Sequence, residues 1–257
     1  MKKVVVITGA SGNLGKAICK EFYKQDYAIV AIDLHQEHLA VLKQDISDEL
    51  TCFTCDITDP DHVRICMEEV IKKFGQIDVL VNNAGITHIE RFEKMSDRIQ
   101  TINKVMNVNF YGAVYCTESC LEALIKSKGC IINISSVAGF APLLGRTAYA
   151  ASKHALHGFF ESLHSELIDQ DVHCMMVCPS FIEAKYNSQN KSSLYQEKKK
   201  IGQDISPDKI AKKIFERMIQ RKALLLSGKT AHLSHWLRRI MPQVYFNKMR
   251  LSLKDTL

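Results

Sequence analysis

Short apolar runs recur along the chain and are separated by longer segments whose apolar residues follow helical spacing. The first run, residues 3–8, is rich in β-branched residues, and a glycine-rich turn and a helical pattern follow it at once. Continuously apolar strands that alternate with helices are typical of a parallel sheet covered on both faces. We therefore predict a doubly wound α/β fold, with a mostly parallel seven-stranded sheet and helices on both faces. The predicted strands are residues 3–8, 28–33, 51–55, 77–82, 130–135, 172–178 and 223–227.

No linker, internal repeat or low-complexity segment interrupts this rhythm over the 257 residues. A chain of this length can bury one sizeable core. We therefore predict a single domain over residues 1–257.

The composition, with 46% hydrophobic and 24% charged residues, is that of an ordinary soluble globular protein, and no window has the pattern of a transmembrane span. The basic start at Met1 precedes an apolar run that is too short for a signal peptide and is needed as a strand. Nine cysteines without a small disulfide-rich frame favour a reducing compartment, so we predict a cytoplasmic location. Cys52 and Cys55 have no partner pair, which favours buried structural thiols over a metal site, and we predict no metal.

The net charge of +6 comes from basic residues that are mostly spread among acidic ones, so nucleic-acid binding has little support.

Glycines 9, 12 and 15 lie between the first predicted strand and the helix that follows it. Backbone N–H groups at such a helix N-terminus can hold a pyrophosphate. The alternative is a tight strand-to-helix turn without a ligand. A P-loop is excluded, because that motif needs a glycine at Ala10 and a hydroxyl residue at Ala17.

Tyr149 and Lys153 are four residues apart in a segment with a helical pattern, which places them on one helix face. A nearby cation favours the phenolate, so we expect the pKa of Tyr149 to lie below its usual value of about 10. Such a pair also occurs by chance on solvated helices, so it needs support from elsewhere in the chain.

That support comes from five short motifs in a fixed order. The motifs are residues 8–15, Asn82-Asn83-Ala84-Gly85, Asn107-Val108-Asn109, Ile134-Ser135-Ser136 and residues 149–153. With these motifs the chain resembles the short-chain dehydrogenase/reductase family from residue 1 to about residue 185. The resemblance implies a Rossmann fold, a nicotinamide cofactor and the interconversion of alcohols and carbonyl compounds.

The resemblance also implies a catalytic tetrad of Asn109, Ser136, Tyr149 and Lys153. Ser136 would orient the substrate carbonyl, Tyr149 would act as general acid in reduction and base in oxidation, and Lys153 would bind the nicotinamide ribose. Asn109 would complete a proton relay through water. Donors from Tyr149 and Ser136 suit the negative charge that hydride transfer leaves on the carbonyl oxygen. The alternatives are a turn cap at Ser136, a surface amide at Asn109 and a solvated charge at Lys153.

Two other classes of function share features with this chain. A non-catalytic NAD(P)-binding regulator would keep the fold without turnover, but it would have no need for Tyr149. A serine hydrolase is disfavoured, because neither Ser135 nor Ser136 lies in a Gly-x-Ser-x-Gly motif.

Cofactor choice depends on Asp33, which closes the second predicted strand. Its carboxylate would accept hydrogen bonds from the adenosine ribose and repel a 2′-phosphate, so NAD is preferred. NADP stays possible if Asp33 only caps the next helix and Lys16 or Lys43 folds back. The full set of expected cofactor residues is Gly9, Ser11, Asn13, Leu14, Gly15, Asp33, Asp56, Ile57, Asn83, Ala84, Gly85, Tyr149, Lys153, Pro179, Ser180 and Ile182.

Three positions depart from the usual family pattern. Asn13 replaces a glycine, which we expect the turn to tolerate because asparagine adopts left-handed backbone readily. Ser180 also replaces a glycine, and Ala184 replaces a threonine that commonly contacts the carboxamide. These two changes predict weaker nicotinamide anchoring.

The substrate is expected to be a small hydrophobic alcohol, ketone or aldehyde. Residues 138–145, between Ser136 and Tyr149, are nearly all apolar and should border the carbonyl together with Ile86 and Ile89. The alternative is that these residues are merely core. Residues 185–250 would form a substrate lid and C-terminal helices of the same domain, with a polar, lysine-rich lid at 185–204 or simply a solvated surface there.

Residues 229–250 carry five basic residues and no acidic one, with apolar residues at helical spacing, and Pro242 should kink or end the helix. Such a helix can contact an anionic membrane peripherally, but packing over the substrate cleft or against another subunit is the favoured interpretation. The apolar positions are Leu233, Trp236, Leu237, Ile240 and Val244. The resemblance further implies a homodimer or homotetramer, with pairing of the helices at about 101–126 and 147–169.

Overall fold

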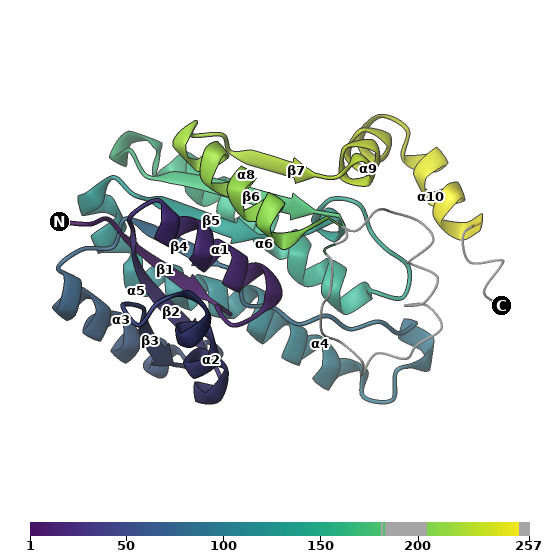
Figure 1. Ribbon diagram of the computed structural model, residues 1–257. Helices are drawn as coiled ribbons and strands as arrows, with labels where there is room; N and C mark the ends of the chain where they lie inside the picture. Colours follow the sequence, from purple (N-terminus) through teal and green to yellow (C-terminus); the bar gives the residue numbers. More distant parts are fainter. Residues whose placement is uncertain (181, 183–204, 252–257) are drawn as a thin grey trace.

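The computed structural model describes residues 1–180, 182 and 205–251 (Figure 1). Seven parallel strands form one sheet in the order β3-β2-β1-β4-β5-β6-β7. The predicted fold class is confirmed, and the sheet is parallel throughout rather than mostly so. The strands are β1 (Val4–Thr8), β2 (Ala28–Asp33), β3 (Thr51–Thr54), β4 (Val79–Asn82), β5 (Cys130–Ile134), β6 (His173–Pro179) and β7 (Leu224–Ser227).

Helices cover both faces of this sheet, because both faces of the strands are apolar. Successive side chains of a strand point to opposite faces. Val5 and Ile7 of β1 accordingly join one core with α1, α2 and α8, while Val4 and Val6 join the other with α3, α5 and α6. The helices are α1 (Asn13–Lys24), α2 (Gln36–Ile46), α3 (Pro60–Phe74), α4 (Arg98–Met106), α5 (Gly112–Ser127), α6 (Thr147–Glu166), α8 (Pro207–Ile219), α9 (Lys229–Ile240) and α10 (Pro242–Leu251).

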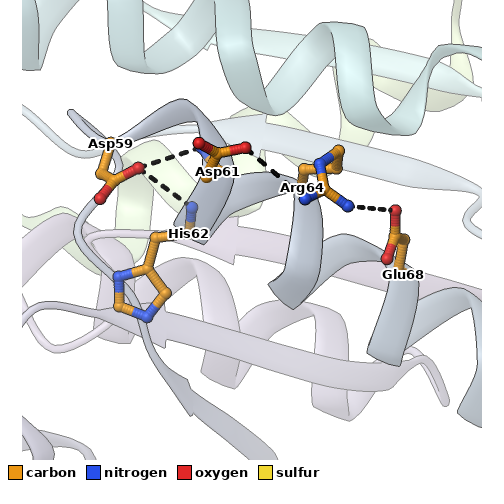
Figure 2. A network of polar contacts seen from close by, with 5 residues as sticks. All are labelled: Asp59, Asp61, His62, Arg64 and Glu68. Atoms are coloured by element: carbon orange, nitrogen blue, oxygen red, sulfur yellow. Dashed lines mark hydrogen bonds and ion pairs between the residues drawn. The ribbon is translucent and has the colours of Figure 1, made fainter.

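The start of α3 is fixed by its own sequence. Asp59 accepts hydrogen bonds from the backbone N–H groups of Asp61 and His62 at 3.0 and 3.2 Å, and Pro60 occupies the first helical position (Figure 2). Further along, Arg64 pairs with Glu68 one turn away at 2.9 Å. This cap sets where the loop after β3 ends, and that loop carries Asp56 and Ile57.

The order of the strands reverses at β1, which pairs with β2 on one side and with β4 on the other. Connections to the two neighbours leave in opposite directions, so a crevice forms at the carboxyl ends of β1 and β4. The predicted glycine turn follows β1 and the predicted Asn83-Ala84-Gly85 segment follows β4, and both therefore lie at this crevice.

The C-terminal helices α9 and α10 form a third, smaller core with the segment after β5. Val137, Ala141, Leu237 and Tyr245 are buried there, and the Tyr245 hydroxyl donates to the Pro142 carbonyl oxygen at 2.8 Å. Pro242 ends the first helix and begins the second, as the sequence predicts. Of the predicted lid, residues 185–204 lie outside the described residues, as does Ala184.

Within residues 1–180 and 205–251, no helix combines the length and apolarity needed to cross a bilayer, and no three His, Cys, Asp or Glu side chains gather as a metal site would require. All nine cysteines are free thiols, and Cys52 alone among them is not fully buried.

Candidate functional site

The turn after β1 is built around positions where no side chain fits. Gly9 has a φ of +60°, and a Cβ there would lie 2.7 Å from the Cα of Ala84. A Cβ on Gly15 would collide with the Gly9 carbonyl oxygen. Asn13 is the first residue of α1 and has no positive φ, so the reason we gave for its tolerance was wrong. Helical backbone at that position accepts any ordinary residue.

Hydrogen bonds tie this turn to the end of β4. The Thr8 hydroxyl accepts from the N–H groups of Asn83 and Ala84, both at 3.1 Å. The Asn83 side-chain amide donates to the carbonyl oxygens of Thr8 and Gly9, both at 2.9 Å. The side chains of Thr8 and Asn83 therefore hold the two halves of the crevice at a fixed separation.

Two adjoining cavities open along this crevice. The larger, of about 470 Å³, is lined by all the expected cofactor residues from Gly9 to Gly85 in the chain. The smaller, of about 250 Å³, is lined by Ser136, Tyr149 and Lys153 and by the remaining expected cofactor residues, Pro179, Ser180 and Ile182. Leu14, Asn83, Gly85 and Ile86 line both. A dinucleotide fits this arrangement, because the glycine turn and the start of α1 lie between the Asp33 end of the larger cavity and the smaller cavity with Ser136, Tyr149 and Lys153.

Asp33 is held at the edge of the larger cavity. One carboxylate oxygen accepts from the Ser11 N–H at 3.0 Å and from the Ser11 hydroxyl at 2.6 Å, and the other accepts from the Leu34 N–H at 2.8 Å. The helix α2 has His35 as its N-cap residue, so Asp33 does not cap that helix. Lys16 forms an ion pair with Asp45 on α2.

Asp56 makes a tight turn, because its carboxylate accepts from the N–H and hydroxyl of Thr58 at 2.9 and 2.7 Å. This turn presents Asp56 and Ile57 to the same cavity.

Ser136 lies two residues beyond the end of β5 and is the N-cap residue of the short 3-10 helix η3 (Val137–Gly139). Its hydroxyl accepts from the Ala138 N–H at 3.2 Å, so the turn-cap alternative is correct as a structural description. The same hydroxyl also lies at the smaller cavity and hydrogen-bonds Tyr149. The capping bond therefore fixes the serine where it can meet a ligand.

Tyr149 and Lys153 lie on successive turns of α6, and the Lys153 ammonium is 5.8 Å from the centre of the Tyr149 ring. Loss of solvent raises the pKa of Tyr149 above its usual value, although the Ser136 hydrogen bond and the charge of Arg146 oppose that rise. Our expectation of a lowered tyrosine pKa is therefore wrong for the protein by itself. Desolvation outweighs the neighbouring charges, and helical spacing does not reveal it.

Desolvation shifts the pKa of Lys153 in the opposite direction to that of Tyr149, because the charged form of lysine is the protonated one. The Lys153 side chain is 4% exposed, and desolvation lowers its pKa to about 8. Its ammonium donates to the Ile134 carbonyl oxygen at 2.8 Å, at the end of β5. Lys153 is thus a buried cation on the floor of the cavity rather than a solvated charge.

Asn109 lies in a π-helical stretch, Asn107–Tyr111, and is 1% exposed. Its side-chain oxygen accepts from the Ile86 N–H at 2.8 Å, and its amide nitrogen donates to the Ile86 carbonyl and to the Ser152 hydroxyl, both at 3.0 Å. Asn109 is therefore no surface amide. Its side chain orients the segment after β4, and its part in a water relay stays a prediction.

Sequence reasoning missed two residues behind Lys153. His157 and Glu161 continue the four-residue spacing of Tyr149 and Lys153 along α6. The Nδ1 of His157 lies 2.8 Å from a Glu161 carboxylate oxygen, and its Nε2 lies 3.5 Å from the sulfur of Cys178. Burial raises the pKa of the Cys178 thiol to about 12, so this cysteine is not a nucleophile at neutral pH. The spacing was visible in the sequence, but the contact with β6 was not.

Comparison with known proteins identifies the family. Residues 3–194 match the family model described as short chain dehydrogenase, and the chain belongs to the short-chain dehydrogenase/reductase family of oxidoreductases. The chain is 30% identical over 261 residues to the dehydrogenase/reductase SDR family member 7B of Xenopus laevis, a match that covers 96% of this chain and 80% of the relative.

Two solved structures share the fold. A short-chain dehydrogenase/reductase from Burkholderia phymatum in complex with NAD gives a TM-score of 0.81 at 23% identity and covers 95% of each chain. The protein ElxO with NADP bound gives a TM-score of 0.76 at 26% identity and covers 88% of this chain and 97% of its own. The first of these two proteins holds NAD and the second holds NADP.

The burial of Lys153 should be measurable as a pH dependence of stability. The folded protein releases the Lys153 proton with a pKa of about 8, whereas the unfolded chain holds it to near 10.5. Between these values the unfolded state binds more protons, so stability rises with pH. From pH 7 to 9.5 we expect the free energy of unfolding of the wild type to rise by about 2 kcal/mol relative to Lys153→Met, measured by urea unfolding.

Lys72→Met, which removes an exposed lysine from α3, is the matched control. Its free energy of unfolding should differ from that of the wild type by the same amount at pH 7 and at pH 9.5. If the difference in free energy of unfolding between the wild type and Lys153→Met were also independent of pH, Lys153 would not be a buried cation with a lowered pKa.

Proposed function

We propose that this protein is an NAD(P)-dependent oxidoreductase that interconverts a hydrophobic secondary or primary alcohol and its ketone or aldehyde, with Tyr149 as general acid and base. The proposal is carried by one observation. Ser136, Tyr149 and Lys153 converge on a cavity that adjoins the larger one lined by the glycine turn and Asp33.

The roles follow from the chemistry of the side chains. The cofactor, when bound, supplies or accepts a hydride at the substrate carbon. Ser136 and Tyr149 would donate hydrogen bonds to the substrate oxygen, and Tyr149 would give up its proton as that oxygen gains negative charge. The raised pKa of Tyr149 keeps the phenol protonated at neutral pH, as a donor in reduction must be. The nearby Lys153 ammonium would stabilise the phenolate that remains.

Apolar residues in the walls of the smaller cavity favour a hydrophobic substrate. Ile86 lines this cavity, and the Glu90 N–H donates to the Gly145 carbonyl at 2.8 Å, which joins the segment after β4 to residues 138–145. Within that apolar segment Ala141 is core, but Leu144 is 44% exposed. The core alternative therefore accounts for Ala141 but not for Leu144, and none of residues 138–145 lines either cavity. The support for an apolar substrate comes from the apolar residues at the smaller cavity, Leu14, Ile86, Ile134 and Ile182.

Asp33 at the larger cavity favours NAD over NADP. Its carboxylate lies at the cavity with no lysine or arginine among the described residues that line it, so a 2′-phosphate would meet a negative charge without a compensating cation. We expect NADH to bind more tightly than NADPH by at least about tenfold, and Asp33→Ala to lower that ratio toward one. Fluorescence titration of both cofactors measures this, and tighter binding of NADPH to the wild type would refute the preference.

Catalysis by Tyr149 is tested by its removal. Tyr149→Phe keeps the ring and deletes the proton donor, so we expect turnover to fall by about 10³-fold or more while the dissociation constant for NADH changes less than about threefold. A turnover screen over apolar alcohols and ketones provides the assay. Tyr245→Phe, which removes a buried hydroxyl bonded to Pro142 rather than to the cavity, is the control. If Tyr149→Phe retained full turnover, the proposed mechanism would be wrong.

The same turnover screen distinguishes an enzyme from a non-catalytic NAD(P)-binding regulator. A protein that binds NADH but turns over none of the apolar alcohols and carbonyls tested would favour the non-catalytic function.

We further propose a homodimer or homotetramer formed through the helices at 101–126 and 147–169. On these helices Tyr111 and Phe159 are large side chains that are 43% and 36% exposed, and Phe159 packs edge-on against Phe110 at 5.9 Å. We expect light scattering to give a molar mass that is a multiple of the 29.1 kDa chain mass. The variant Phe159→Asp should have a lower molar mass in solution than the wild type. Ile65→Asp, at an exposed apolar position on α3, is the control. A monomeric wild type would exclude this interface.

The cytoplasmic location also stays a prediction.

A further inference from the structure

The helix α9 has one face inside the protein and one face outside it. Ala231 and Leu237 are buried, and the latter packs with Tyr245 against the segment after β5. Figure 1 shows α9 and α10 at the end of the molecule opposite the N-terminus. The inner face therefore already has its partner within the chain.

The outer face is apolar as well. Leu233, Trp236 and Ile240 are spaced three and four residues apart, which places them in one stripe along α9. Their side chains are 55%, 52% and 58% exposed, and Met241, which follows them, is 43% exposed. Single exposed apolar side chains are ordinary, but a stripe that includes a tryptophan marks an interaction site.

The charged residues of the segment that carries this stripe have one sign. The whole chain has 34 basic and 28 acidic residues, a net charge of +6, and residues 229–250 contribute five basic residues and no acidic one. Six minus five leaves a net charge of +1 for the remainder of the chain. Lys229, Arg239, Lys248 and Arg250 are exposed, and Arg238 stacks on the Phe246 ring at 5.1 Å.

We propose that this face of α9, together with the basic residues of α10, docks on the surface of a bilayer that contains anionic lipid. An apolar stripe with tryptophan inserts at the boundary between headgroups and acyl chains, while lysine and arginine attract anionic headgroups. A second copy of this chain fits less well, because self-pairing of the same patch would bring five positive charges against five more. The docking does not depend on the proposed reaction, and its tests need no substrate.

Trp236 provides a direct readout, because it is the only tryptophan in the chain. Vesicles of phosphatidylcholine with about a third phosphatidylserine should shift its fluorescence emission to shorter wavelength, and lipids brominated in the acyl chains should quench it. Pure phosphatidylcholine vesicles should produce a much smaller change. No shift and no quenching with the anionic vesicles would overturn the proposal.

Co-sedimentation with the same vesicles tests the stripe. The variant Leu233→Gln/Ile240→Gln keeps the tryptophan and should lower the partition coefficient by at least about tenfold, with unchanged circular dichroism and NADH binding. The matched control is Ile65→Gln/Ile219→Gln, which changes two side chains that are 49% and 60% exposed on α3 and α8. The control should sediment like the wild type.

Two results would count against the docking. Equal sedimentation of the stripe variant and the wild type would show that the stripe is not what binds. A drop in molar mass of the stripe variant by light scattering without vesicles would assign the face to a second copy of the chain.

Discussion

The crevice exists because the backbone after β1 passes in direct contact with the backbone after β4. Gly9 approaches Ala84 so closely that a Cβ would lie 2.7 Å from its Cα, and the Thr8 hydroxyl and Asn83 amide bond across the same junction. These contacts join the two halves of the sheet where the strand order reverses. Gly9, Asn83 and Ala84 also line the larger cavity, so the contacts that hold the fold together at this edge also fix one wall of that cavity.

The catalytic side chains depend on a second constraint, which is the burial of Lys153 and the partial burial of Tyr149 where α6 packs against β6 and the segment after β5. Burial raises the pKa of Tyr149 and lowers that of Lys153, so the site disfavours charge on both. A developing negative oxygen would be disfavoured there too, unless hydrogen-bond donors were already aimed at it. The backbone cap holds Ser136 in place, and the Ile134 carbonyl holds Lys153. Such preorganisation makes a partly desolvated site compatible with proton transfer.

Much of the fold could be predicted from the sequence, because a parallel sheet buried on both faces requires continuously apolar strands. Every strand end lies within two residues of its predicted position. Long-range contacts could not be predicted in this way. The bonds from Asn109 to Ile86 and Ser152 span 23 and 43 residues, and no periodicity encodes them. The pKa of Tyr149 was misjudged for the same reason, since helical spacing gives the nearest cation but not the depth of burial.

The C-terminal helices show how a pattern can predict an element and leave its partners open. The five apolar positions predicted in residues 229–250 cover more of the helix surface than packing against a single neighbour buries. The structure divides them, because Leu237 and Val244 pack inward while Leu233, Trp236 and Ile240 remain outside. A helix that is apolar on two sides needs two apolar environments. The protein core is one of them, and the anionic bilayer surface that we propose is the other, since residues 229–250 carry five basic residues and no acidic one.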